Sequence, residues 1–241
     1  MERKAENREP VTVRTDTTPT DTEPVKPVSD SSKYIIEVKN AKKYFRETKA
    51  LDDVSVRFER NRIHGIIGRN GSGKTVLLKS ICGLIPLTAG EVIVDGRRVG
   101  KDVEIPKNIG AIIESPGFIE EFSGLENLKF LAGLTGKVDM PKLRELMKFT
   151  GLDPSSKKKV RRYSLGMRQR LGIAQAIMDD PDILLLDEPT NGLDNRGVAD
   201  FREMLLKKRD EGKTILIASH NSADIELLCD TVCELDAGKL L

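Results

Sequence analysis

The segment GRNGSGKT, residues 68–75, constrains the fold of this chain more than any other stretch. It fits the pattern G-x-x-x-x-G-K-[ST], follows the apolar run HGII and precedes KTVLLKSICGL, in which apolar residues recur at helical spacing. Glycines let such a loop turn its backbone N–H groups toward phosphate oxygens, and the N-terminus of the next helix adds partial positive charge. The segment therefore predicts a strand, a nucleotide-binding loop and a helix in succession.

Short apolar strands and helical segments alternate along the rest of the chain. YIIEV and VSVRF have the pattern of half-buried strands, and EVIVD, IGAIIE, ILLLD, TILIAS and TVCELD follow as further strands. Residues from about 122 to 180 carry helical patterns only, with Pro141 suited to a first turn and Gly151 to a C-terminal stop. This order predicts an α/β fold whose mostly parallel sheet is flanked by helices, with a helical subdomain of about residues 115–180 inserted in the core.

The N-terminal segment, the lengths of the apolar runs and the cysteines indicate the kind of environment in which the protein folds. Residues 1–33 are rich in Thr, Pro and charged residues without an apolar period, which predicts a flexible tail before a domain spanning residues 34–241. No apolar run approaches the roughly 20 residues of a membrane-spanning helix, and no secretory signal is recognisable. The three cysteines, Cys82, Cys229 and Cys233, lie in apolar segments and are expected to be buried thiols in a reducing cytosol rather than a metal site.

Acidic residues follow the apolar run ILLL of residues 183–186. A buried parallel strand there would deliver Asp187 and Glu188 to the carboxyl edge of the sheet. Beside a phosphate loop, Asp187 is expected to hold Mg²⁺ and Glu188 to orient or deprotonate the attacking water. The other reading, a strand that ends in two solvated acids, is common for any single strand but less favoured here.

Two further side chains end apolar strands, Glu114 after GAII and His220 after ILIAS. Ligands of open α/β sheets bind at that edge, so both are candidates for the same site. A surface corner remains the alternative for Glu114, and a structural role remains the alternative for His220. His64 lies inside a strand and is assigned no role.

Together these motifs resemble the ATP-binding cassette of ABC transporters over residues 34–241. GRNGSGKT resembles the Walker A motif, ILLLDE the Walker B motif, NGLD the D-loop and His220 the switch histidine, while YSLGMRQRLGIA occupies the place of the signature. The resemblance implies a P-loop NTPase core with an N-terminal antiparallel β region, ATP and Mg²⁺ as cofactors, and ATPase activity. It implies catalytic roles for Glu188, His220 and Glu114, and metal binding by Thr75, Asp187 and Glu114. The implied nucleotide contacts are Tyr44, Gly68, Arg69, Asn70, Gly71, Ser72, Gly73, Lys74, Thr75, Val76, Ser164, Gly166 and Asp194.

The resemblance also implies two protein partners. A second cassette would form an ATP sandwich in which Ser164 and Gly166 meet the partner's γ-phosphate, although Ser164 could also simply cap a helix, which is compatible with that role. A membrane permease would dock on the region of Phe118, Ile119 and Phe122, although these apolar residues could equally belong to the core. The subunit would then lie at the cytoplasmic face of the cell membrane and power transport.

Several positions depart from the usual family pattern. Glu114 replaces a glutamine, Leu165 and Met167 alter the signature, and Val76 replaces a second hydroxyl. IGAIIESPGF joined to YSLGMRQRLGIA resembles the branch that handles bacitracin, lantibiotics and related antimicrobial peptides, which predicts export of, or resistance to, such an amphiphile. An anion about 4 Å from another unit charge costs roughly 4 kcal/mol at an effective dielectric of 20, so Glu114 near a γ-phosphate would have to share the Mg²⁺.

Two other classes compete with this reading. A cassette ATPase acting on nucleic acid or the ribosome could use KKKVRR, residues 157–162, against phosphates. No nucleic acid is expected, because 40 basic and 38 acidic residues nearly balance and the chain has neither a coiled-coil insertion nor a second cassette. A P-loop kinase or small GTPase is disfavoured by the paired acids, the signature-like segment and the lack of a guanine-reading Asn-Lys-x-Asp segment.

Overall fold

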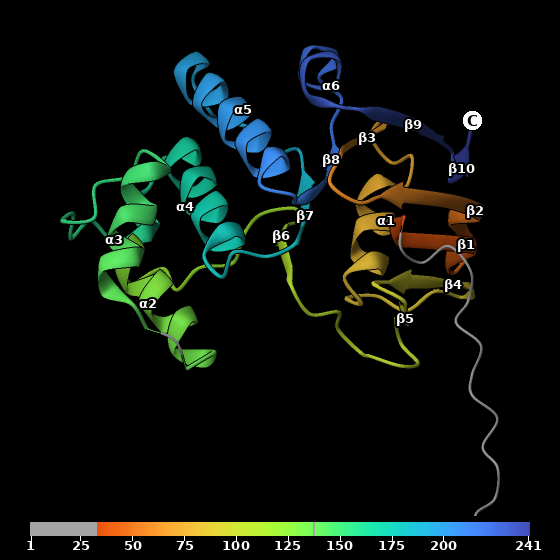
Figure 1. Ribbon diagram of the computed structural model, residues 1–241, viewed down its shortest axis with the longest axis horizontal. Helices are drawn as coiled ribbons and strands as arrows, with labels where there is room; N and C mark the ends of the chain where they lie inside the picture. The colour runs from red at the N-terminus through yellow and green to blue at the C-terminus, as the bar shows by residue number, and fades with distance from the viewer. Residues whose placement is uncertain (1–32, 137) are drawn as a thin grey trace, which may run out of the picture.

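The computed structural model describes residues 33–136 and 138–241 (Figure 1). Apart from Lys33, the expected tail of residues 1–33 lies outside the described residues. Three of the predicted features are confirmed: a mostly parallel sheet, an antiparallel β region at the start, and helices that flank both. The division into a tail and a domain with an inserted subdomain stays a prediction.

The antiparallel sheet has the order β2-β1-β4-β5. Its strands are β1 (Tyr34–Phe45), β2 (Thr48–Glu59), β4 (Ala89–Val94) and β5 (Arg97–Arg98). The first two strands are longer than the apolar patterns indicate, because polar residues of both continue the pairing as far as Phe45 and Thr48.

The second sheet has the order β10-β9-β3-β8-β7-β6 and is parallel except for the β9–β10 pair. Its strands are β3 (Ile63–Ile67), β6 (Ile109–Ile112), β7 (Ile183–Asp187), β8 (Thr214–Ala218), β9 (Thr231–Asp236) and β10 (Lys239–Leu240). The carboxyl ends of β3, β8, β7 and β6 therefore lie side by side at one edge. Each of these four strands is followed by a segment that carries a candidate site residue.

The helices are α1 (Lys74–Ile81), α2 (Gly124–Leu134), α3 (Met140–Phe149), α4 (Leu165–Ile177), α5 (Asn195–Asp210) and α6 (Ser222–Leu228), and Val160–Arg162 forms a 3₁₀ turn. Local sequence explains where several begin. Ser123 and Glu126 form a capping box at α2, and Asp139 caps α3 with Pro141 in its first turn. Gly151, with φ of 76°, follows the end of α3 as expected.

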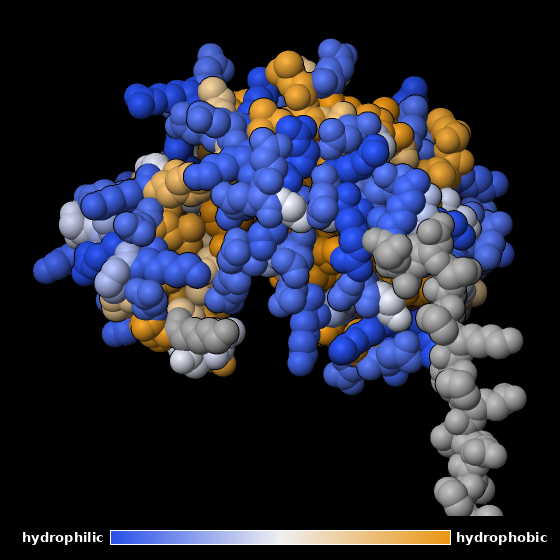
Figure 2. Space-filling view, in the orientation of Figure 1, coloured by the Kyte–Doolittle hydropathy of each residue, from blue (hydrophilic) through white to orange (hydrophobic). Residues whose placement is uncertain are grey.

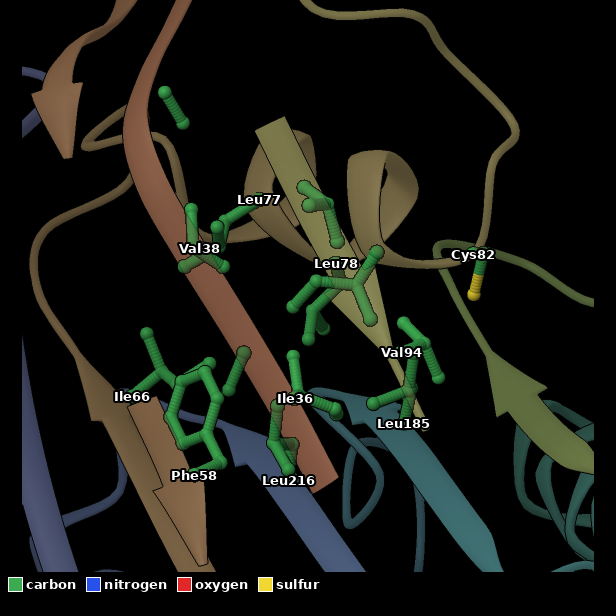
Figure 3. Packing of buried hydrophobic residues seen from close by; sticks show 14 of the residues in the cluster. Ile36, Val38, Phe58, Ile66, Leu77, Leu78, Cys82, Val94, Leu185 and Leu216 are labelled. Atoms are coloured by element: carbon green, nitrogen blue, oxygen red, sulfur yellow. The ribbon is translucent and has the colours of Figure 1, made fainter. Parts of the chain in front are cut away.

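Alternate residues of the parallel strands enter two different cores. Ile66, Leu185 and Leu216 face α1 and the antiparallel sheet, where they pack with Ile36 and Leu78 (Figure 3). Their neighbours in the strands point to the opposite face and pack among α4, α5 and α6; these are Leu184, Leu186, Ile215 and Ile217. Because both faces of the sheet are covered, its strands appear in the sequence as continuous apolar runs.

A third apolar cluster lies within the helices α2, α3 and α4, which gather on the left of Figure 1. Leu128, Met147 and Leu171 are fully buried at its centre. Phe118 packs against this cluster, whereas Ile119 is exposed. Among the helices of the described residues, none combines the length and apolarity needed to cross a membrane.

His64 and the three cysteines lie within, or directly at the ends of, strands and helices of the fold. His64 is buried, with Nδ1 2.6 Å from Thr231 Oγ1 and Nε2 2.8 Å from the Glu59 carbonyl, and burial lowers the pKa of its imidazole. Cys82 is buried, whereas Cys229 and Cys233 are only partly so, and burial raises the pKa values of the three thiols to about 12, 12 and 11.

Candidate functional site

A pocket of about 790 Å³ lies at the carboxyl edge of the parallel sheet. Its walls come from segments that are distant in sequence: residues 48–50, 70–76, 114–115 and 187–188, together with Leu165, Gln169, Asn191 and Ala237. The volume is in the range of small-molecule sites.

The loop before α1 prepares one side of this pocket for an anion. Gly73 has φ of 110°, and a Cβ there would lie 2.5 Å from the Ala50 carbonyl oxygen, so only glycine fits. Lys74 is 6% exposed, and its Nζ donates to the carbonyls of Gly68 at 2.6 Å and Arg69 at 3.1 Å. Among the described residues no carboxylate forms an ion pair with Lys74. A buried cation at a helix N-terminus without an anionic partner favours binding of a phosphate group.

Asp187 and Thr75 place two oxygen ligands beside the loop. The Thr75 hydroxyl donates to Asp187 Oδ2 at 2.7 Å, and Asp187 is 7% exposed. Burial raises the pKa of the Asp187 carboxyl, and the hydrogen bond from Thr75 opposes that shift. Hydroxyl and carboxylate oxygens are ligands that Mg²⁺ prefers, so this donor set fits the expected metal. Among the described residues, no cluster of three or more His, Cys, Asp or Glu side chains could hold a metal ion.

Glu188 is held next to Asp187 by contacts from β8 and the loop after it. Its backbone has φ of 47°, in the left-handed region, and its N–H donates to the Ala218 carbonyl at 2.8 Å. The carboxylate lies 2.7 Å from His220 Nδ1 and 3.4 Å from Ser219 Oγ. A non-glycine residue in this conformation costs of order 1–3 kcal/mol, so surrounding contacts must hold it there.

Glu114 lies across the pocket, after β6, and also has a left-handed backbone with φ of 58°. Its Oε1 forms an ion pair of 2.5 Å with Nζ of Lys79, a residue of α1. The Glu114 side chain is 63% exposed, and the residue lines the pocket.

Six of the expected nucleotide contacts do not line this pocket. The Gly68 and Arg69 carbonyls face Lys74, and the Tyr44 hydroxyl donates to Asp52 at 3.3 Å. The others lie near the start of α4 or α5: Ser164 caps α4, Asp194 caps α5 and pairs with Arg170, and a Cβ on Gly166 would lie 2.5 Å from the Gly192 carbonyl.

Gln169 and Leu165 also line the pocket, although neither is among the site residues expected from the sequence. Gln169 is buried, and its Nε2 donates to the Pro189 carbonyl at 2.8 Å. Leu165 packs on Gly192. The spacing from Ser164 puts Gln169 on the second turn of α4, but no local signal pairs it with a residue 20 positions further on.

The chain is similar to known proteins in both sequence and structure. A sequence profile of the family described as ABC transporter matches residues 51–191. The uncharacterized ABC transporter ATP-binding protein YybJ of Bacillus subtilis (strain 168) is 42% identical over 206 residues, which cover 86% of this chain and 94% of that protein.

Two further relatives carry transport names. The bacitracin transport ATP-binding protein BcrA of Enterococcus faecalis is 38% identical, covering 86% of this chain and 68% of its own. The lantibiotic transport ATP-binding protein SrtF of Streptococcus pyogenes is 35% identical, covering 86% and 89%.

Solved structures share the fold. The ATP-binding subunit of an ABC transporter superposes with a TM-score of 0.77 at 26% identity, over 86% of this chain and 88% of that one. A cassette solved as a dimer in a post-hydrolysis state, bound to ADP and Pi, gives a TM-score of 0.77 over 85% and 96%. At 23% identity this second likeness supports the fold alone.

Proposed function

The chain belongs to the ABC transporter family as an ATP-binding subunit that hydrolyses ATP, and from that premise we propose that it drives a membrane permease as one half of a dimer of cassettes. The observation that carries the proposal is the buried Lys74, which forms no ion pair with a carboxylate of the described residues, beside Thr75, Asp187 and Glu188 in a single pocket. A cation, a pair of oxygen ligands and a further carboxylate are what binding and hydrolysis of a metal-bound triphosphate require.

Each of these side chains takes one role. Lys74 and the N–H groups of residues 71–75 bind the β- and γ-phosphates. Thr75 and Asp187 hold Mg²⁺, which when bound offsets part of the phosphate charge. Glu188 orients the attacking water and accepts its proton as the water oxygen bonds to the γ-phosphorus and the bond to the bridging oxygen breaks, releasing ADP. His220 holds the Glu188 carboxylate from the solvent side, at 2.7 Å.

The dimer is inferred from groups that do not reach their own pocket. Ser164 is exposed at the N-terminus of the 13-residue helix α4, and its Oγ accepts from Met167 N–H at 3.2 Å. A second subunit would bring its own triphosphate to Ser164 and Gly166, where helix polarity favours an anion. Asp194 and Tyr44 would complete the nucleotide contacts when the site closes.

The permease is proposed to dock beside α2. Ile119, Phe130 and Leu134 are 36%, 48% and 70% exposed there. The rings of Phe122 and Phe130 pack edge-to-face, with their centroids 6.4 Å apart. Figure 2 shows a recess at its lower edge, between the helical region and the antiparallel sheet. The subunit would thus act at the cytoplasmic face of the membrane, and its relatives BcrA and SrtF support an antimicrobial peptide as the transported solute.

Glu188→Gln tests this function. The variant should bind ATP, lose hydrolysis and accumulate as a dimer with Mg-ATP in gel filtration, because the closed state can no longer hydrolyse its nucleotide. Glu203→Gln, which removes a charge from the exposed face of α5, is the control and should behave like the wild type. A Glu188→Gln protein that stays monomeric at every ATP concentration would contradict the proposed dimer.

Action on nucleic acid is the disfavoured alternative. Within the basic segment 157–162, Lys159 pairs with Glu126 at 3.4 Å and Arg161 pairs with Glu121 at 3.0 Å, so acids of the chain already balance part of its charge. ATP hydrolysis should therefore be insensitive to added DNA, RNA or ribosomes.

A further inference from the structure

We propose that Gln169 is a positioning residue for Glu188, and that through it hydrolysis in one pocket depends on how α4 grips the partner's nucleotide. This inference rests on the proposed function. It begins from the hydrogen bond that Gln169 Nε2 donates to the Pro189 carbonyl at 2.8 Å. Pro189 follows Glu188 directly, so this bond restrains the backbone carbonyl one residue beyond the catalytic carboxylate.

Glu188 needs such a contact because its backbone is left-handed, with φ of 47°. Without restraint, a non-glycine residue would relax to a more favourable region and turn its side chain away. The Glu188 N–H is fixed to Ala218 at 2.8 Å. Gln169 fixes the carbonyl of the following residue, and the two bonds together define the orientation of the intervening backbone.

The segment 188–190 is also held by a side-chain hydrogen bond at its last residue, Thr190. The Thr190 hydroxyl donates to Asp224 Oδ2 at 2.8 Å, and Asp224, 2% exposed, receives two hydrogen bonds from Arg202 at 2.6 and 2.8 Å. This grip comes from α5 and α6, which belong to the core beside the parallel sheet. Gln169 alone brings a side-chain hydrogen bond from α4 to the segment, among the described residues.

Because Gln169 lies on α4, its hydrogen bond connects the Pro189 carbonyl to the helix that Ser164 caps. Ser164 caps the helix, and Gln169 lies five residues on, about 7.5 Å along the axis at the α-helical rise. Leu165, on the first turn, packs on Gly192 of the loop that follows Thr190. A nucleotide bound at Ser164 would therefore fix a rigid helix whose second turn holds the Pro189 carbonyl.

The test compares two glutamines of one helix. Gln169→Met keeps the length of the side chain but removes the N–H donor, whereas Gln175→Met changes a residue whose buried amide oxygen has no hydrogen-bond partner among the described residues. In the full chain, Gln169→Met should lower kcat for ATP about tenfold or more, since small misplacements of a catalytic group cost of order 100-fold. The Kd for Mg-ATP should stay within about twofold of the wild type, and Gln175→Met should leave both values unchanged.

Two further measurements separate positioning from a structural role. The Hill coefficient for ATP hydrolysis should fall to about 1 in Gln169→Met. Combined with Glu188→Gln, Gln169→Met should still give the ATP-dependent dimer, because Gln169 acts on hydrolysis and not on assembly. Gln169→Leu, which also lacks the donor and adds no charge, repeats the test if Gln169→Met does not fold.

Wild-type kcat in both Gln169 variants, an unchanged Hill coefficient, or loss of the dimer only when Gln169 is altered would overturn the inference. Failure of Glu188→Gln alone to form the dimer would instead refute the proposed function.

Discussion

Lys79→Gln and Glu114→Gln should change the Mg²⁺ dependence of ATP hydrolysis in opposite directions. In the structure the Glu114 carboxylate forms an ion pair with Lys79, whose Nζ lies 2.5 Å from Glu114 Oε1. If Glu114 contributes to metal binding when the pocket closes, Lys79 competes with the metal for its carboxylate. Removing Lys79 should release that carboxylate, while removing the charge of Glu114 should abolish its contribution.

The size of the effect follows from the exposure of the pair. The Lys79 and Glu114 side chains are 26% and 63% exposed, so the ion pair contributes only about 0.2–1 kcal/mol. Lys79→Gln should therefore lower the half-saturating Mg²⁺ concentration by a factor of about 1.4 to 5, at RT of about 0.59 kcal/mol. Glu114→Gln should raise it by about tenfold or more, the usual loss when a group supporting a metal is replaced.

The assay is phosphate release at saturating ATP, titrated with free Mg²⁺. Lys129→Gln removes the same charge from the exposed side of α2 and should give the wild-type curve. The double variant of Lys79 and Glu114 should match Glu114→Gln alone, since no carboxylate remains for Lys79 to hold. Shifts of the two single variants in the same direction, or an unchanged curve for Glu114→Gln, would refute the reasoning.

Two predictions concern the scaffold. Burial lowers the pKa of the His64 imidazole from its ordinary 6.5, so the unfolded chain binds a proton at a higher pH than the folded chain does. The free energy of unfolding should therefore fall as the pH drops below about 6.5. In urea titrations this dependence on pH should be weaker for His64→Gln, with His220→Gln, at an exposed position, as the control. A Cβ on Gly110 would lie 1.9 Å from the Ala176 carbonyl, so Gly110→Ala should cost about 3 kcal/mol or more by thermal unfolding. Gly117→Ala, where nothing lies within 4 Å, should be nearly neutral, and equal losses at both glycines would contradict this account.

The parallel sheet and the phosphate loop were predictable from the sequence because their causes are local. Strands covered on both faces require continuous apolar residues, as in ILLL and TILIA, and their lengths agree with β7 and β8. The helix starts were predictable for the same reason, since caps such as Ser164 act within three residues. The shared edge of β3, β8, β7 and β6 then followed from parallel strand direction.

Contacts between distant segments were not predictable in this way. The strands β5 and β10 have two residues each and depend on pairing with β4 and β9 rather than on their own composition. The partners of Glu114 and Pro189, namely Lys79 and Gln169, lie 35 and 20 positions away. No spacing rule connects them, because the fold alone brings α1 and α4 to the pocket.

The signature segment shows why its glycine at position 166 is retained while position 165 can carry a leucine. Gly166, the second residue of α4, lies so close to the loop after β7 that a Cβ would be 2.5 Å from the Gly192 carbonyl, and backbone at that distance cannot yield as a side chain can. Leu165 is 66% exposed, and its side chain packs on Gly192. Glycine at 166 is thus required by packing within one subunit, before any contact with a second nucleotide is considered. Leu165 is exposed at the start of α4, so the leucine changes the surface that a facing partner would meet.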